Sequence, residues 1–174
     1  MTLRYDLLRT PVGLAIAVLS EDGVLALRVT SDDPEWALEL LARAHGIAPA
    51  HAPGAAAALD EQLAEYFAGD RRAFTVPLDW GLTRDFARTA LQRVCEIPYG
   101  ETAAYGEIAA AAGRPRAARA VGTACRTTPL SLVVPVHRVV RADGSLGEYG
   151  SQPETKRFLV DLERARRRHE TENP

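Results

Sequence analysis

The stretch Tyr105–Arg126, YGEIAAAAGRPRAARAVGTACR, decides the fold of the second half of this chain. Its two ends have the composition of helices, and the Gly-Arg-Pro triplet at residues 113–115 is a turn signal. The stretch therefore predicts two helices joined by a tight turn, the outline of a helix-turn-helix. Any tight pair of helices produces this outline, so DNA binding does not follow from it alone.

The second helix of this pair is nearly bare of bulky side chains. Arg119 and Arg126 interrupt a run of small residues: Ala117, Ala118, Ala120, Gly122 and Ala124. Helices that read base edges in the major groove usually carry several long polar side chains. A helix of small residues can instead approach a narrow groove closely, with Arg119 intruding into the duplex. Close packing against another helix explains the small residues equally well, and the sequence leaves both interpretations open.

The composition is that of an ordinary globular protein, with 174 residues, 47% of them hydrophobic and 25% charged. No run approaches the roughly 18 to 20 apolar residues that span a bilayer, and the first residues lack the apolar core of a secretory signal. We therefore expect a cytoplasmic, monomeric protein without membrane contact. The two cysteines, Cys95 and Cys125, form neither a disulfide framework nor a metal pattern, so we expect no metal and no cofactor.

Charge is distributed unevenly along the chain. The first 80 residues carry 6 Arg against 12 Asp and Glu, whereas the remainder carries 15 Lys and Arg against 11 Asp and Glu. A basic half beside an acidic half indicates contact of the second half with a polyanion. Part of the excess comes from the tail RARRRHE (residues 164–170), which is equally explained as a solvated helix end.

Residues 1–79 predict a small α/β domain. The runs at 14–20 and 24–30 favour strands, and Glu21-Asp22-Gly23 between them is a hairpin signal. A helix is expected after Asp33 as N-cap and Pro34 as first helical residue. The remaining expected elements are a strand at 2–8, a helix at 59–70 ending at Gly69, and a last strand at 72–80.

Residues 80–174 predict a helical domain. Phe86, Ala90, Val94 and Ile97 lie on one stripe of an expected helix over 83–97, with Thr83 as its cap. Further along, His137 is the one histidine with an informative setting, because the other three lie in a Pro- and Ala-rich linker or in the charged tail.

Three segments together resemble the O6-alkylguanine-DNA alkyltransferases, or methylated-DNA–protein-cysteine methyltransferases. These are IPYGETAAYGEIAAAAGRPRAARAVG at 97–122, PVHRV at 135–139 and ADGSLGEYG at 142–150. Members of this family move an alkyl group from damaged guanine to their own cysteine. The resemblance covers residues 83 to about 163. It implies a ribonuclease-H-like α/β domain (1–79) and an all-α, winged-helix-like domain (80–174) that contains the helix-turn-helix.

The resemblance also implies how the protein meets double-stranded DNA. The second helix would enter the minor groove, and Arg119 would fill the place of a nucleotide rotated out of the stack. Tyr105 would press on the phosphate beside that nucleotide. Extruding a base costs a few kcal/mol, and an inserted side chain offsets part of that cost. The expected DNA-binding residues are Tyr105, Ala117, Ala118, Arg119, Ala120, Gly122 and Arg126.

The chain departs from the family at the reacting atom. In the family, the cysteine directly before a histidine accepts the alkyl group. The histidine makes the thiolate of this cysteine available, and a glutamate orients the histidine. His137 and Glu163 match the last two, but Val136 takes the cysteine's place. Because valine has no lone pair, alkylation at this position is impossible. The expected lesion pocket comprises Thr128, Val136, His137, Tyr149 and Ser151.

A relocated acceptor is an unfavoured alternative. Cys125 has a better claim than Cys95, because the adjacent Arg126 would lower the pKa of its thiol. Neither cysteine matches a pocket position of the family.

Other positions have changed together with the acceptor. Thr128 stands where the family has Asn, Ser151-Gln152 where it has a Gly-rich run, and Ala87 where it usually has Gln. Joint change favours natural loss of the acceptor over a laboratory substitution.

The leading interpretation is a non-catalytic alkyltransferase-like protein. It would bind O6-alkylguanine and flag it for another pathway, notably nucleotide excision repair. Two alternatives stay open: a pocket re-used by a small-molecule enzyme or binder, and a disabled mutant of an active alkyltransferase.

Overall fold

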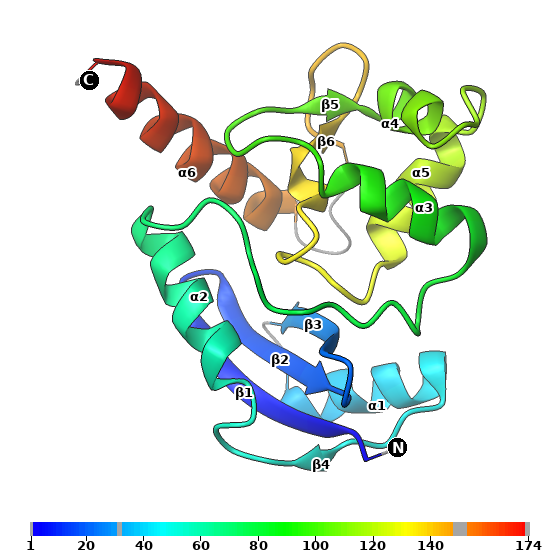
Figure 1. The fold of residues 1–174 in the computed structure, drawn as a ribbon, viewed down its shortest axis with the longest axis vertical. Helices are drawn as coiled ribbons and strands as arrows, with labels where there is room; N and C mark the ends of the chain where they lie inside the picture. Colours follow the sequence, from blue (N-terminus) through cyan, green and yellow to red (C-terminus); the bar gives the residue numbers. More distant parts are fainter. Residues whose placement is uncertain (1, 31–32, 148–152, 173–174) are drawn as a thin grey trace. The chain divides into compact units, whose positions relative to one another are not determined.

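The computed structural model describes residues 2–30, 33–147 and 153–172 (Figure 1). The chain forms two compact units. Unit 1 runs up to Leu82 and takes in Pro129–Val133, and unit 2 comprises Thr83–Thr128 and the residues from Val134 onward. A single division after residue 79 was expected from the sequence. The chain instead returns to unit 1 for one short segment.

Unit 1 contains a four-stranded sheet in the order β3-β2-β1-β4 (Figure 1). Its strands are β1 (Arg4–Thr10), β2 (Gly13–Leu19), β3 (Val24–Thr30) and β4 (Ala50–His51). The β1–β2 and β2–β3 pairs are antiparallel, and β4 runs parallel to β1. The expected hairpin between β2 and β3 is confirmed. Gly23 is required in it, because its φ is +139° and a Cβ there would lie 2.2 Å from the Pro77 carbonyl oxygen.

Two helices complete unit 1, α1 (Pro34–His45) against β2 and α2 (Ala57–Ala68) against β1. The Asp33 carboxylate accepts a hydrogen bond from the Glu35 N–H at 2.9 Å, which confirms the expected N-cap. The expected strand at 72–80 was wrong, since only Leu78 forms an isolated bridge, to Val24. Pro77 has no N–H to donate to a ladder, which explains the interruption.

The segment Pro129–Val133 lies against β3. The Leu27 N–H donates to the Pro129 carbonyl at 2.8 Å, and the Ser131 hydroxyl donates to the Leu27 carbonyl at 2.8 Å. Leu130 and Leu132 on this segment are 0% and 1% exposed. The segment is therefore a buried part of unit 1 and not a surface connection.

Unit 2 is built around the predicted helix-turn-helix. Its two helices are α4 (Tyr105–Ala111) and α5 (Ala118–Thr127), and α3 (Asp85–Val94) packs on both. The helix α3 is shorter than expected, and its N-cap residue is Arg84, not Thr83. The 3₁₀ turn η1 (Val136–Arg138) follows in the chain, and the long helix α6 (Pro153–Glu172) packs on η1.

The expectation of an all-α second domain was wrong. The strands β5 (Ala103–Ala104) and β6 (Val139–Val140) pair in parallel. Strands of two residues carry no alternation of apolar and polar residues, so periodicity gave no sign of them. The ribonuclease-H-like and winged-helix-like descriptions stay predictions. Among the described residues, no helix is long and apolar enough to cross a membrane.

Candidate functional site

The parallel pair β5–β6 brings two parts of the predicted site together. The strand β6 directly follows η1, and β5 directly precedes Tyr105, the first residue of α4. The register pairs Ala103 with Val139 and Ala104 with Val140. The turn that carries Val136 and His137 is therefore held beside the start of α4 by backbone pairing.

The predicted pair of His137 and Glu163 is present and buried. His137 Nε2 lies 2.7 Å from Glu163 Oε1, and both side chains are 1% exposed. Arg138, whose role the sequence did not reveal, donates from Nε to Glu163 Oε2 at 2.9 Å and from Nη2 to Oε1 at 3.0 Å. The Gly100 N–H donates to Oε2 at 2.9 Å. A single carboxylate of α6 thus ties together η1 and the turn before β5.

These contacts shift the ionisation of both partners. Burial alone would raise the pKa of Glu163, but hydrogen bonds from His137 and Arg138 and the charge of Arg138 outweigh it and lower the pKa to about 2. Burial lowers the pKa of His137, against the opposing effect of Glu163. The network consequently combines an ionised carboxylate with an imidazole whose neutral form is favoured.

Val136 occupies the first position of η1 and is 3% exposed. Its N–H donates to the Val134 carbonyl at 2.8 Å, so the turn is tight, and His137 is the next residue in the chain. The position that the resemblance assigns to the reacting cysteine therefore presents only apolar surface.

Neither cysteine replaces the acceptor. Cys125 is 7% exposed, and burial raises the pKa of its thiol to about 12, although the charge of Lys156 acts the other way. The expected lowering by Arg126 was wrong, because Arg126 is exposed and the cation near the thiol is Lys156. Cys95 is exposed at the C-terminal end of α3. A thiol that stays protonated at neutral pH is a poor nucleophile.

Tyr105 lies in a close-fitting setting of small residues. A Cβ on Gly147 would lie 2.4 Å from its hydroxyl and 3.0 Å from its ring, so a side chain at 147 would have to displace Tyr105. A Cβ on Gly122 of α5 would be 3.8 Å from the ring. That is an ordinary van der Waals distance, so Gly122 lies beside the Tyr105 ring but a Cβ would also fit there.

Lys156 is a site residue that the sequence interpretation missed. It is 0% exposed, and its Nζ donates to the Val139 carbonyl at 2.5 Å and to the Tyr105 hydroxyl at 3.5 Å. Burial lowers the pKa of its ammonium to about 8. The available sequence signal was that Lys156 is the only lysine in a chain otherwise rich in arginine. Lys156 links α6, β6 and Tyr105.

The outer face of α5 carries the two predicted arginines. Arg119 and Arg126 are exposed and lie two helical turns apart on the same side. Ala120 is exposed beside Arg119, whereas Ala117, Ala118 and Gly122 are half-buried. Ala117, Ala118 and Gly122 are therefore available for packing inside unit 2, whereas the approach of Arg119 and Ala120 to a groove stays a prediction. Thr128, half-buried, caps the end of the helix. Tyr149 and Ser151 lie outside the described residues.

Sequence comparisons agree with this geometry. Residues 85–165 match the family described as 6-O-methylguanine DNA methyltransferase, DNA binding domain. The chain is 38% identical over 162 residues to the constitutive methylated-DNA–protein-cysteine methyltransferase of Bacillus subtilis, covering 92% of this chain and 94% of that protein. It is 46% identical over 114 residues to the methylated-DNA–protein-cysteine methyltransferase of Mycobacterium tuberculosis, covering 66% of this chain and 68% of that protein.

Solved structures give the same result. The O6-methylguanine methyltransferase of M. tuberculosis superposes with a TM-score of 0.81 at 37% identity, covering 95% of this chain and 94% of that one. The M. tuberculosis protein OGT in complex with DNA has a TM-score of 0.81 at 35% identity, with 94% of each chain covered. With identity this high over nearly the whole length of both chains, the protein belongs to the 6-O-methylguanine DNA methyltransferase family.

Proposed function

We propose that this protein binds O6-alkylguanine in double-stranded DNA without transferring the alkyl group to itself. One observation carries the proposal. Val136, 3% exposed, stands in the acceptor's place beside the intact pair of His137 and Glu163. Attack on an O-alkyl carbon needs a nucleophile with a lone pair, and valine has none. The relatives are named cysteine methyltransferases, and this chain carries Val136 where the resemblance places the acceptor cysteine.

The DNA would lie on the outer face of α5. Arg119 is exposed on that face with Ala120 next to it, which allows the helix to approach a minor groove while one cation projects into the duplex. Extrusion of the alkylated nucleotide costs a few kcal/mol, least for a base that already pairs badly. Insertion of Arg119 offsets part of that cost. Tyr105 would hold the phosphate beside the extruded nucleotide.

The extruded base would meet an apolar and largely uncharged wall. Val136 offers its isopropyl group to the alkyl substituent, and the lowered pKa of His137 favours a neutral imidazole beside it. Valine is bulkier than cysteine, so large alkyl groups would be accommodated differently from methyl. The resemblance adds Thr128, Tyr149 and Ser151 to this wall.

A protein that holds the lesion and leaves it unchanged serves repair by passing it on. We infer a hand-over in the cytoplasm to a pathway that excises the damaged strand, nucleotide excision repair. The complex of this protein with the lesion would then be the signal, because other proteins would remove the alkylated nucleotide.

The test is a fluorescence anisotropy titration at one fixed salt concentration, because phosphate contacts make affinity steeply salt-dependent. Two labelled duplexes differ only in one O6-methylguanine. We expect tighter binding of the damaged duplex, and the methyl group still on the DNA afterwards by mass spectrometry. Equal affinities would refute lesion recognition and turn attention to small-molecule ligands of the pocket.

A matched pair of variants separates lesion reading from general charge. Arg119→Ala removes the intruding side chain, whereas Arg116→Ala removes an equally exposed arginine just before α5. We expect Arg119→Ala to lose most of the lesion preference and Arg116→Ala to weaken both duplexes alike.

A further inference from the structure

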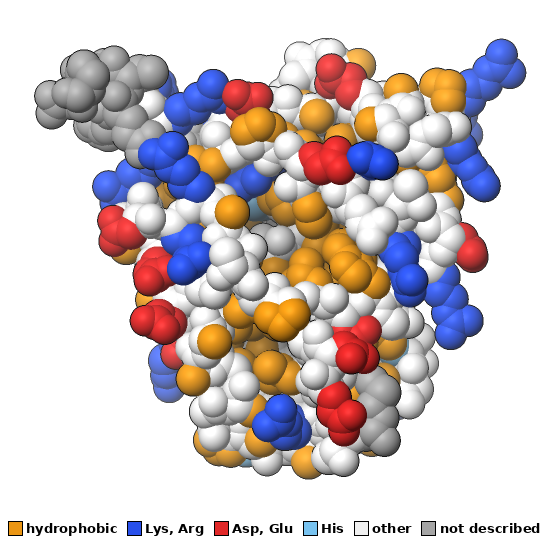
Figure 2. Space-filling model, viewed as in Figure 1, with side chains coloured by type: hydrophobic (Ala, Val, Ile, Leu, Met, Phe, Trp, Pro, Cys, Tyr) orange, Lys and Arg blue, Asp and Glu red, His pale blue; other side chains and the backbone are white. Residues whose placement is uncertain are grey.

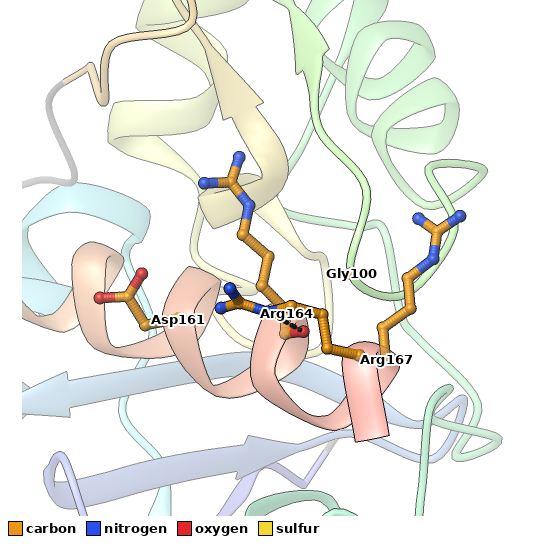
Figure 3. Close-up of a pocket in the computed structure, with 5 residues that line it drawn as sticks. Gly100, Asp161, Arg164 and Arg167 are labelled. Atoms are coloured by element: carbon orange, nitrogen blue, oxygen red, sulfur yellow. Dashed lines mark hydrogen bonds between the residues drawn. The ribbon is translucent and has the colours of Figure 1, made fainter. Parts of the chain in front are cut away.

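The C-terminal part of α6 forms one side of a hollow in unit 2. The hollow has a volume of about 450 Å³ and is lined by Gly100, Asp161, Arg164, Arg167 and Arg168 (Figure 3). The three arginines come from consecutive turns of one face of α6, at the i, i+3, i+4 spacing. They belong to the basic tail that the proposed DNA contacts do not use.

A glycine makes this hollow possible. Gly100 has a φ of +76°, and a Cβ on it would lie 3.1 Å from Arg167 Cδ and 3.3 Å from the Glu163 carbonyl oxygen. Only glycine lets the turn before β5 approach α6 this closely. The backbone of this turn forms the opposite wall, and its N–H holds Glu163. The hollow is thus fixed by the same contact that anchors the His137 network.

The hollow lies away from the proposed DNA-binding face. The helix α5 packs on α3 and α4, whereas α6 packs on η1. Within unit 2, the C-terminal end of α6 and the helix α5 lie on opposite sides (Figure 1). Basic side chains gather over α6 on the surface (Figure 2). A duplex on α5 would therefore leave the arginines accessible.

Carboxylate groups suit this hollow. Arg167 Nη2 already lies 2.9 Å from Glu101 Oε1, with both side chains about half exposed (50% and 44%). Guanidinium groups present planar forks that match carboxylates in a bidentate manner. The volume far exceeds that of one carboxylate, so several acidic side chains fit. Asp161 also lines the hollow, so its basic part comprises Arg164, Arg167 and Arg168.

We propose that this hollow is the docking site for an acidic segment of a partner protein. The proposal rests on the proposed function, because a protein that only binds a lesion needs a second surface through which the next repair factor is engaged. The position opposite α5 allows lesion and partner to be held at the same time. No covalent step is involved.

The test uses a fluorescein-labelled peptide of twelve residues, alternating Glu and Ala, titrated with the full-length protein in the absence of DNA. The test variant is Arg164→Glu with Arg168→Glu. Its matched control is Arg166→Glu, which reverses an exposed arginine in the same part of α6 that does not line the hollow. We expect the double variant to bind the peptide about tenfold more weakly than the control, as several exposed charge pairs are lost.

Three outcomes would overturn the docking site. The first is no measurable peptide binding, and the second is equal binding by the double variant and Arg166→Glu. The third is a double variant that keeps the peptide but loses a single-stranded oligothymidine, which would identify the hollow as a nucleic-acid contact. Lesion preference is measured separately on duplexes, where the double variant should equal wild type. If the wild-type protein binds the peptide but shows no preference for the damaged duplex, the proposed function is refuted and the docking site is not.

Discussion

His137 Nε2 lies 2.7 Å from Glu163 Oε1, across 26 residues of sequence, and both side chains are 1% exposed. Val136 stands at the position that the resemblance assigns to the reacting cysteine, so this contact has no thiol directly before the histidine. The same carboxylate also binds Arg138 and the Gly100 backbone. The pair therefore remains useful as a structural joint between α6, η1 and the turn before β5.

Glu163→Gln tests this structural role. The substitution removes the charge that faces Arg138 and leaves a guanidinium buried at 7% exposure without its counter-ion. Breaking a buried pair in this way typically costs about 3–5 kcal/mol. We expect a melting temperature lower by roughly 10 °C for a protein of this size. Glu154→Gln, at an exposed position of α6, should change stability by less than about 1 kcal/mol. A Glu163→Gln variant that melts at the same temperature as wild type would contradict the structural role of Glu163.

Acid should destabilise the protein in two steps. The pKa of His137 is lowered from 6.5, so the unfolded state takes up its proton first, and stability falls as the pH drops below 6.5. The pKa of Glu163 is lowered from 4.5 to about 2, so its contribution is complete above 4.5 and is lost between 4.5 and 2. Urea unfolding from pH 7 to pH 3 should show both declines. The decline below pH 4.5 should be absent in Glu163→Gln. If this variant shows the same decline below pH 4.5 as wild type, Glu163 is not its source.

Val136→Cys places a thiol beside the buried histidine. Because His137, Arg138 and Glu163 are already joined, we expect this variant to take up one alkyl group per molecule from O6-methylguanine DNA. Intact-protein mass spectrometry measures the transfer. Val136→Ser is the matched control, since an alcohol lacks the nucleophilicity of a thiolate. Absence of transfer in Val136→Cys would show that changes elsewhere, such as Thr128, have also altered the pocket.

The affinity for lesion DNA should fall above about pH 8. Burial lowers the pKa of Lys156 to about 8, and its ammonium holds the Val139 carbonyl and Tyr105. Its deprotonation weakens the support of Tyr105, an effect of about 1 kcal/mol or roughly fivefold in affinity.

The other ionisable groups near this ammonium include Tyr105, Cys125, Arg141 and His137. Cys125 has a pKa near 12, and His137 has already lost its proton, so neither titrates between pH 7 and pH 9. Anisotropy at constant ionic strength measures the decline. Lys156→Met should bind weakly at every pH, and Arg119→Ala should keep the pH dependence. A decline in Lys156→Met equal to that of wild type would exclude Lys156 as its source.

Gly147→Ala should displace Tyr105. The new Cβ would lie 2.4 Å from the tyrosine hydroxyl, which no packed structure tolerates. We expect several-fold weaker binding of damaged and undamaged duplexes with the fold retained by circular dichroism. Gly106→Ala is the control, because a Cβ at that neighbouring α4 position meets nothing within 4 Å. Wild-type affinity in Gly147→Ala would mean that the Tyr105 position does not matter for DNA binding.

Local signals predicted the elements of the fold well. Asp33 and Pro34 located the start of α1, Gly69 located the end of α2, and the turn at 113–115 separated α4 from α5. These signals act within a few residues, which is why a sequence displays them. The strand expected at 72–80 failed although Pro77, which lacks an N–H for a ladder, was a visible local signal against it.

The site was predictable only in part. The pair of His137 and Glu163 was expected from the family resemblance and not from spacing. Arg138 and Lys156 were missed because their partners lie 25 and 17 residues away and are fixed only once α6 packs on η1 and β6. A buried lysine has no sequence pattern of its own, and its being the only lysine in the chain was the sole indication.

The return of Pro129–Val133 to unit 1 makes the protein difficult to divide genetically. A gene that begins at Thr83 would encode a chain without β3. In that chain Leu130 and Leu132, now 0% and 1% exposed, would lose the strand against which their segment lies. The Pro129 carbonyl and the Ser131 hydroxyl would lose their partners on Leu27 at the same time. A chain shortened in this way would expose these two leucines to water, so the second half of the sequence depends on the sheet of unit 1 to cover its own apolar residues.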